Sequence, residues 1–281
     1  MYGKVYVIFK RCIALISAIM LLIVSMDERG LPDPDGATVI AKQRYVLEDY
    51  YMSNQGVTND GTYFYFSGKK NLGKADMKTG EIFRINTAPI PKALAELGCN
   101  HIGGLSYYNG IVYAALEDGP DYQHPFIVLY DAQTLSFTGT YYALPQNLHT
   151  EGVPWCAVDE VRQVLYTAEW SNAAVLNVFA LDDLRLVGTI PLSAPIDRMQ
   201  GGELFGDTLY LSCDEENDLK RVFAVNVLTG DVQAAFSRNI GKAFEAEDLT
   251  VYADTDGQPV ICVLDRGARR KSMNLTKYRL N

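Results

Sequence analysis

Asn54-Gln-Gly-Val57 is the first of five similar short stretches, and their spacing decides how the fold of this chain is interpreted. The other four are Ile102-Gly-Gly-Leu105, Thr150-Glu-Gly-Val153, Met199-Gln-Gly-Gly202 and Ala246-Glu-Asp-Leu249. The second residues of these stretches stand at 55, 103, 151, 200 and 247, so successive copies are 48, 48, 49 and 47 residues apart. Such regular spacing predicts one structural unit repeated five times.

Each repeat has the strand pattern of a propeller blade. A second β-rich run follows each stretch after a turn, and a hairpin follows that run, which gives four strands per repeat. The last repeat shows only three strands and ends at residues 275–280, whereas residues 44–47 offer a spare strand at the other end of the chain. We therefore predict an all-β fold, a single five-bladed β-propeller over residues 44–281, whose last blade is closed by the N-terminal strand.

Composition and charge narrow the possible partners. The chain has 281 residues, of which 48% are hydrophobic and 21% charged, as in a folded globular protein. Its formal net charge is −9, and the first 26 residues contain three basic and no acidic residues, so the rest is more acidic still. An acidic surface repels a phosphate backbone, which argues against nucleic acid as a partner. We expect a monomer with a small-molecule or peptide ligand.

The N-terminus has the layout of an export signal. Lys10 and Arg11 precede an apolar run over residues 12–24. As a helix this run would be about 20 Å long, shorter than the ~30 Å hydrocarbon core of a bilayer. Residues 1–26 are thus predicted to be a signal peptide, with an uncleaved signal anchor as the alternative, followed by a linker over residues 27–43. Both alternatives place the propeller outside the cytoplasm, either secreted or tethered to the membrane through this segment alone.

Two smaller features complete the expected structure. Beyond the signal, the cysteines are Cys99, Cys156, Cys213 and Cys262. No two of them are close in sequence and three lie in expected strands, so we predict buried free thiols rather than disulfides or metal ligands. Residues 91–97 predict a helix between the first two repeats, as a lid or as filler.

Propeller topology brings first-strand starts and second-strand ends to one mouth of the central axis. The expected first-strand residues are Gln55, His101, His149, Glu151, Arg198, Gln200, Glu245 and Glu247, with His101 and His149 at equivalent positions of adjacent blades. The second-strand ends supply Glu117, Glu169, Asp214 and Asp265, and Trp170 follows one of them. These residues either line a water-filled channel or form a functional site. Repulsion between the acids would favour a counterion or a cationic ligand.

Three chemistries are compatible with this mouth. Glu151, Glu245 and Glu247 would offer hard oxygen ligands to calcium, and adding the two histidines would favour a transition metal. Glu151 with His149 or His101 would form an acid–base pair for catalysis. The strand-end acids, with Trp170 as an apolar wall, would recognise an amine or another polar ligand. We predict an exported propeller that binds a small polar, cationic or metal ligand at an acidic axial mouth.

Some motifs resemble known propeller families. Asn54-Gln-Gly-Val-Thr58 and the hairpin Lys78-Thr-Gly-Glu81 resemble the first blade of plant-type glutaminyl cyclotransferases, five-bladed propellers that convert N-terminal glutamine to pyroglutamate. That family opens its second blade with Gly-Glu-Gly-Leu-Thr, where this chain has Gly103-Gly-Leu-Ser106. This resemblance implies an enzyme of that type as the alternative function. Ala246-Glu-Asp-Leu-Thr250 resembles regucalcin-like and phytase-like propellers, many of which bind calcium, and so implies calcium as the cofactor.

Overall fold

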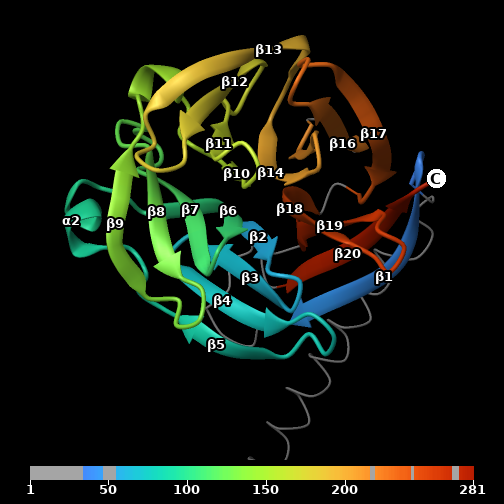
Figure 1. Cartoon of the computed structure of the whole chain (residues 1–281). Helices are drawn as coiled ribbons and strands as arrows, with labels where there is room; N and C mark the ends of the chain where they lie inside the picture. Colours follow the sequence, from blue (N-terminus) through green and yellow to red (C-terminus); the bar gives the residue numbers. More distant parts are fainter. Residues whose placement is uncertain (1–33, 47–54, 216–218, 242–243, 268–271) are drawn as a thin grey trace, which may run out of the picture.

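Five four-stranded antiparallel sheets surround a common axis (Figure 1). The computed structural model describes residues 34–46, 55–215, 219–241, 244–267 and 272–281. The predicted fold is confirmed, because each sheet is one blade of a five-bladed β-propeller. The predicted signal over residues 1–26 lies outside the described residues. Within them, no helix is both long enough and apolar enough to cross a bilayer.

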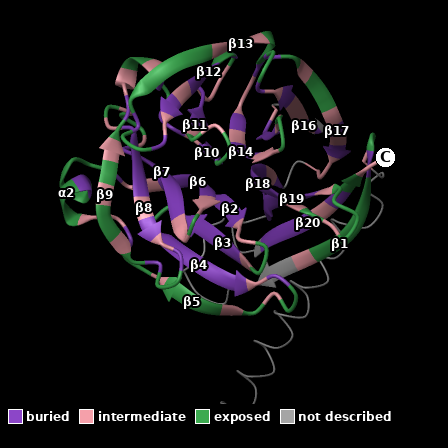
Figure 2. Cartoon of the chain, in the orientation of Figure 1, coloured by how far each residue is buried: buried purple, intermediate pink, exposed green. Residues whose placement is uncertain are grey.

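In blades 1 to 4 the strands run outward from the axis in sequence order, so the first strand is innermost and the last is outermost; in blade 5 the N-terminal strand lies outside the three strands of the last repeat. The blades are: blade 1, β2 (Gly56–Asn59), β3 (Tyr63–Gly68), β4 (Asn71–Asp76) and β5 (Ile82–Asn86); blade 2, β6 (His101–Tyr108), β7 (Ile111–Glu117), β8 (Phe126–Asp131) and β9 (Phe137–Ala143); blade 3, β10 (Ala157–Asp159), β11 (Val164–Thr167), β12 (Ala173–Ala180) and β13 (Leu186–Ile196); blade 4, β14 (Met199–Phe205), β15 (Thr208–Cys213), β16 (Leu219–Asn226) and β17 (Val232–Asn239); blade 5, β18 (Glu245–Ala253), β19 (Pro259–Arg266) and β20 (Ser272–Leu280). The inner strands are mostly buried and the outer strands mostly exposed (Figure 2).

The N-terminal strand closes blade 5, as predicted. β1 (Ala37–Val46) pairs antiparallel with β20, from Ala37 opposite Leu280 to Val46 opposite Ser272. This strand begins at Ala37, not at Arg44, so the end of the expected 27–43 linker belongs to the propeller. The β-branched residues at 38–40 explain the earlier start, because they favour extended backbone.

A short bridge ties the start of β1 to the neighbouring blade. The backbone N–H of Asp35 donates to the carbonyl of Ser237 on β17 at 2.8 Å, and the Ser237 N–H donates back at 2.9 Å. The N-terminal segment therefore contacts blade 4 before it completes blade 5.

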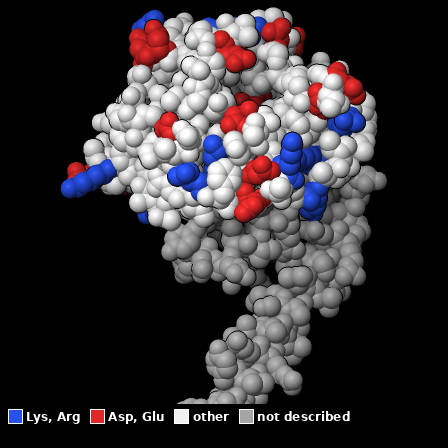
Figure 3. Space-filling model, turned by 60° about the horizontal axis from the view of Figure 1, so that its bottom comes forward, with Lys and Arg blue, Asp and Glu red and all other residues white. Residues whose placement is uncertain are grey.

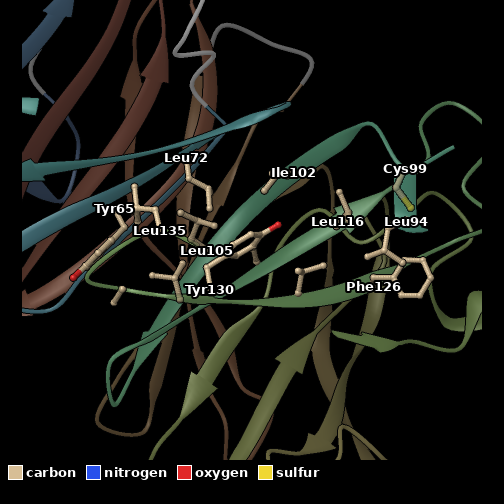
Figure 4. Packing of buried hydrophobic residues seen from close by; sticks show 14 residues of the cluster. Tyr65, Leu72, Leu94, Cys99, Ile102, Leu105, Leu116, Phe126, Tyr130 and Leu135 are labelled. Atoms are coloured by element: carbon tan, nitrogen blue, oxygen red, sulfur yellow. The ribbon is translucent and has the colours of Figure 1, made fainter. Parts of the chain in front are cut away.

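Hydrophobic side chains fill the spaces between blades. In the cluster between blades 1 and 2, Tyr65 and Leu72 of blade 1 meet Leu105 and Tyr130 of blade 2 (Figure 4). The predicted helix is present as α2 (Lys92–Glu96), and its Leu94 is fully buried in this cluster. The helix thus extends the core. The predicted thiols are confirmed as well: the free and buried cysteines are Cys99, Cys156, Cys213 and Cys262.

Candidate ligand site at the axial mouth

The strand registers align the blades residue by residue. The second strands of blades 1 to 4 carry a tyrosine at the same position. In each blade, one residue of the first strand pairs with this tyrosine, or with Cys262 in blade 5. We call these five first-strand residues the deep layer: Thr58, Ser106, Ala157, Glu203 and Thr250. The described residues that stand five positions earlier in each blade are His101, Gly152, Arg198 and Glu245, which we call the mouth layer.

Three residues of the mouth layer form an ion pair within their own blade. His101 Nδ1 lies 2.7 Å from Glu117 Oε1. Arg198 Nη2 lies 3.2 Å from Asp214 Oδ2. Glu245 pairs with Arg266, the residue opposite it on β19. In blades 2 and 4 the mouth layer thus supplies the nitrogen group, and the end of the second strand supplies the acid.

His101 is also hydrogen-bonded to the next blade. Its Nε2 contacts Gln55 Oε1, and Gln55 Nε2 donates to Glu247 Oε1 at 3.0 Å. Both ring nitrogens of His101 therefore have an oxygen partner. A continuous polar chain thus runs from Glu117 in blade 2, through blade 1, to Glu247 in blade 5.

The three glutamates predicted as metal ligands have other partners. Glu245 and Glu247 share Arg266, whose Nε lies 3.4 Å from Glu247 Oε1. Glu151 accepts a hydrogen bond from Ser171. Burial raises the pKa of Glu247 well above its usual value. Within the described parts of the chain, no group of three or more His, Cys, Asp or Glu side chains could hold a metal ion.

The remaining strand-end acids are neutralised by more cations than the sequence suggested. Asp214 contacts Lys220 Nζ at 2.5 Å in addition to Arg198. Asp265 receives Arg238 Nη1 at 2.7 Å on both carboxylate oxygens. The repulsion expected between the acids of the mouth is therefore relieved in large part by the protein itself. On the side of the molecule in Figure 3, basic and acidic side chains likewise lie next to one another.

Of two further predicted ligand-binding residues, Trp170 packs against Arg198. The guanidinium of Arg198 lies 4.7 Å from the centroid of the Trp170 ring, so the indole forms a flat wall beside this cation. Gln200, on β14, is partly exposed.

Blade 3 departs from the pattern because Gly152 provides no cation. Glu169 Oε1 accepts hydrogen bonds from the N–H and hydroxyl of Thr150, both at 3.0 Å. Glu169 Oε2 is buried and has no hydrogen-bond partner among the described residues, and the same is true of Glu117 Oε2. Gly152 has a φ of +89°, and a Cβ at this position would overlap Glu117 Oε2 and lie 2.8 Å from Tyr122 Cδ1. Two unpaired carboxylate oxygens thus border the segment 150–152.

Glu151, His149 and His101, predicted as an acid–base pair, each contact other residues in the described chain. His149 is fully buried, contacts the Pro145 carbonyl at 2.9 Å and the Thr167 hydroxyl at 2.8 Å, and has a pKa lowered by burial. Counted back from the deep layer, Gly152 and not His149 stands at the position that His101 has in blade 2. The stretch 150–153 lies in the loop before β10, since Pro154 has no N–H for a strand ladder.

Asp248 and Trp155, which were not among the predicted site residues, lie near the axis next to the mouth. Asp248 accepts backbone N–H groups from Val57 at 2.9 Å and Leu105 at 3.1 Å, which face the axis and have no strand partner there. A Cβ at Gly201 would overlap Asp248 Oδ1, and a Cβ at Gly104 would lie 2.9 Å from the Cβ of fully buried Trp155. The glycines of these stretches therefore make room for an axial carboxylate and an indole.

Comparisons with known proteins support the fold alone. No family model matches the sequence, and no curated protein matches it. Among solved structures, the tail fiber of a Staphylococcus aureus phage has a TM-score of 0.52 and 14% identity, with coverage of 85% of this chain and 52% of that chain. Hydrazine synthase of Kuenenia stuttgartiensis has a TM-score of 0.45 and 14% identity, with coverage of 79% and 58%. This chain spans little more than half the length of either. The fold defines the class, a five-bladed β-propeller, and these similarities define nothing narrower.

Proposed function

We propose that this propeller binds a small ligand with a protonated amino group at the axial mouth, between blades 2 and 3. The observation that supports this is the pair of buried, unpaired oxygens, Glu117 Oε2 and Glu169 Oε2, next to Gly152. A buried acceptor without a donor costs about 1–3 kcal/mol, and more when it is charged. An ammonium group brings three donors and a positive charge.

The arrangement favours an amine over a metal ion. The second oxygen of Glu117 is used by His101, and that of Glu169 is used by Thr150. Each carboxylate therefore offers one oxygen, which suits hydrogen bonds from one ammonium better than the six to eight oxygen ligands of calcium. The indole of Trp170, in the loop that follows Glu169, would provide an apolar surface for the rest of the ligand.

Access to this site requires a local movement. The backbone at Gly152 covers Glu117 Oε2, and Thr150 is held by Glu169. Glu151, between them, is exposed and hydrogen-bonded to Ser171. The ligand would thus displace the segment 150–152, and the binding energy has to exceed the cost of breaking these contacts.

Calorimetric titration with propylamine and with propanol tests the proposal. The two probes have nearly the same size, so only the charge and the donors differ. We expect propylamine to bind at neutral pH and propanol not to bind. Equal heats for the two probes, or no binding of either, would contradict the proposal.

A Glu–His pair favours catalysis as a second candidate. His101 and Glu117 are 2.7 Å apart, and Glu117 also borders the proposed amine site. This pair is positioned to move a proton at an amino-group substrate, with glutaminyl cyclisation as its most concrete form. A peptide with N-terminal glutamine should then lose ammonia, as measured by mass. Absence of turnover between about pH 5 and pH 9 would exclude this form of catalysis.

We further propose that the propeller acts outside the cytoplasm, on the evidence of Lys10, Arg11 and the apolar run after them. A fusion of the N-terminal segment to a reporter enzyme that is active only after export tests this. Export of the fusion supports the proposal, and retention in the cytoplasm contradicts it.

A further inference from the structure

Glu203 brings a buried carboxylate to the axis, deeper than the mouth. It belongs to the deep layer, two positions further along its strand than Gly201, the residue that faces Asp248. Its side chain is 9% exposed. Burial raises the pKa of Asp248, a second buried carboxyl group, which lies close enough for the charge of Glu203 to raise this pKa further above the usual value.

Hydroxyl groups from three other blades converge on this carboxylate. Thr58 Oγ1 of blade 1 donates to Glu203 Oε2 at 2.9 Å, and Thr250 Oγ1 of blade 5 donates to the same oxygen at 3.3 Å. Ser106 Oγ of blade 2 donates to Glu203 Oε1 at 3.3 Å. Blade 3 contributes Ala157 to this layer, so its position has no polar side chain. Oxygen atoms from four blades thus meet at one point on the axis.

The charge of Glu203 has no counterion within the described chain. Each of the buried acids Asp159, Asp214 and Asp265 contacts an Arg or Lys side chain. The three groups that contact Glu203 are neutral, and desolvation raises its pKa to about 8. Two of the three contacts, at 3.3 Å, are also longer than the 2.5–2.7 Å typical of a hydroxyl bonded to a carboxylate. A buried carboxylate in this position requires either a proton or a cation.

We infer that Glu203, Thr58, Ser106 and Thr250 form an axial binding site for a small hard monovalent cation, with sodium as the expected occupant. Ser106 Oγ also accepts the Val158 N–H at 3.0 Å, and Thr250 Oγ1 accepts Asn59 Nδ2 at 2.7 Å. After donating its hydrogen to the carboxylate, each of these hydroxyls keeps one lone pair for a cation. One carboxylate among neutral oxygens balances a single positive charge, whereas calcium sites usually contain several carboxylates. A bound cation would link four of the five blades at the centre of the ring.

Thermal unfolding in different salts tests this site. The chelator-treated protein is melted in about 0.2 M sodium chloride and in choline chloride of equal ionic strength, because the choline ion is too large for the site. At about pH 9, where Glu203 is ionised, we expect sodium to raise the melting temperature by several degrees. At about pH 6 a proton occupies the carboxylate, so the difference should be small.

Two variants identify the residues responsible. Glu203→Gln should abolish the sodium effect, and Thr250→Val, which removes one hydroxyl at similar volume, should reduce it. Glu160→Gln, an exposed glutamate of blade 3, is the matched control and should keep the full effect. Equal melting temperatures in sodium and choline at pH 9 would overturn the inference. A sodium effect that survives in both Glu203→Gln and Thr250→Val would also overturn it. Neither outcome bears on amine binding, because the two sites share no residue.

Discussion

The backbone of Gly152 lies directly against Glu117 Oε2, while the other oxygen of the same carboxylate contacts His101. Gly152 stands five residues before the deep-layer residue of blade 3, as His101 does in blade 2. One carboxylate thus contacts an imidazole on one side and a bare glycine on the other. This asymmetry is the structural basis for a cationic ligand in the gap between the two blades.

Gly152→Ala should be strongly destabilising and should abolish amine binding. The new methyl group would overlap Glu117 Oε2, and the φ of +89° is unfavourable for alanine. Gly257→Ala is a matched control, because Gly257 has a φ of +76° but no heavy atom within 4 Å of the added carbon. We expect Gly152→Ala to lose about 2 kcal/mol more than the control in chemical denaturation. An equal loss of the free energy of unfolding in Gly152→Ala and Gly257→Ala would show that the structure accommodates the added methyl group without cost.

The pH dependence of stability should report on Glu203. Its folded-state pKa of about 8 lies above its usual value of 4.5, so its contribution to stability is fully present below about pH 4.5 and is lost as the pH rises through about 8. Glu203→Gln should remove this loss. In choline chloride, the free energy of unfolding of the variant should therefore rise relative to that of the wild type between about pH 5 and pH 9, by a few kcal/mol at most. Parallel pH profiles for the two proteins would contradict the assignment.

Asp248→Asn should weaken the inner wall of the ring. The carboxylate accepts N–H groups from Val57, Leu105 and Leu249, and an amide would turn a donor toward at least one of them. We expect a loss of about 1–3 kcal/mol in the free energy of unfolding. Asp182→Asn, at an exposed position of blade 3, should change it by less than about 0.5 kcal/mol. A loss at Asp248 no larger than that of the control would mean that these N–H groups find other acceptors.

Deletion of residues 34–46 should open the ring. It removes β1 and the bridge from Asp35 to Ser237, and it leaves β20 as an exposed edge. The control is a variant that lacks only residues 1–33 and so keeps β1. Compared with this control, we expect the variant that also lacks residues 34–46 to aggregate or to have a much lower melting temperature. Identical melting curves for the two truncations would show that β1 is dispensable for closure.

Much of the architecture could be predicted from the sequence because it depends on local patterns. Regular spacing of the small-residue stretches and the turns between strands predicted the five blades and their closure. The regular spacing did not predict the site residues of blade 3 correctly. The first strand of this blade begins only after Pro154, so Glu151 and His149 lie in the loop before it. The alternation of polar and apolar residues along the sequence does not show where this strand begins.

The site was less predictable because its decisive contacts are long-range. Lys220 and Arg238 lie on the third and fourth strands of blade 4, yet they neutralise acids at second-strand ends, and Arg238 does so in the next blade. Glu203 has no sequence neighbour that marks it as axial. Its role follows only from the register that places Thr58, Ser106 and Thr250 around it. Three-dimensional pairing between repeats was needed to find these relationships.

The affinity of propylamine for Glu169→Gln, compared with Glu160→Gln, tests the central claim most directly. Both variants remove one negative charge from blade 3, but only Glu169 has a buried oxygen without a hydrogen-bond partner. Calorimetry should show at least about tenfold weaker binding to Glu169→Gln and unchanged binding to Glu160→Gln, since a charge-assisted hydrogen bond contributes about 1.5–3 kcal/mol. Equal affinities for the two variants would contradict an amine site between blades 2 and 3.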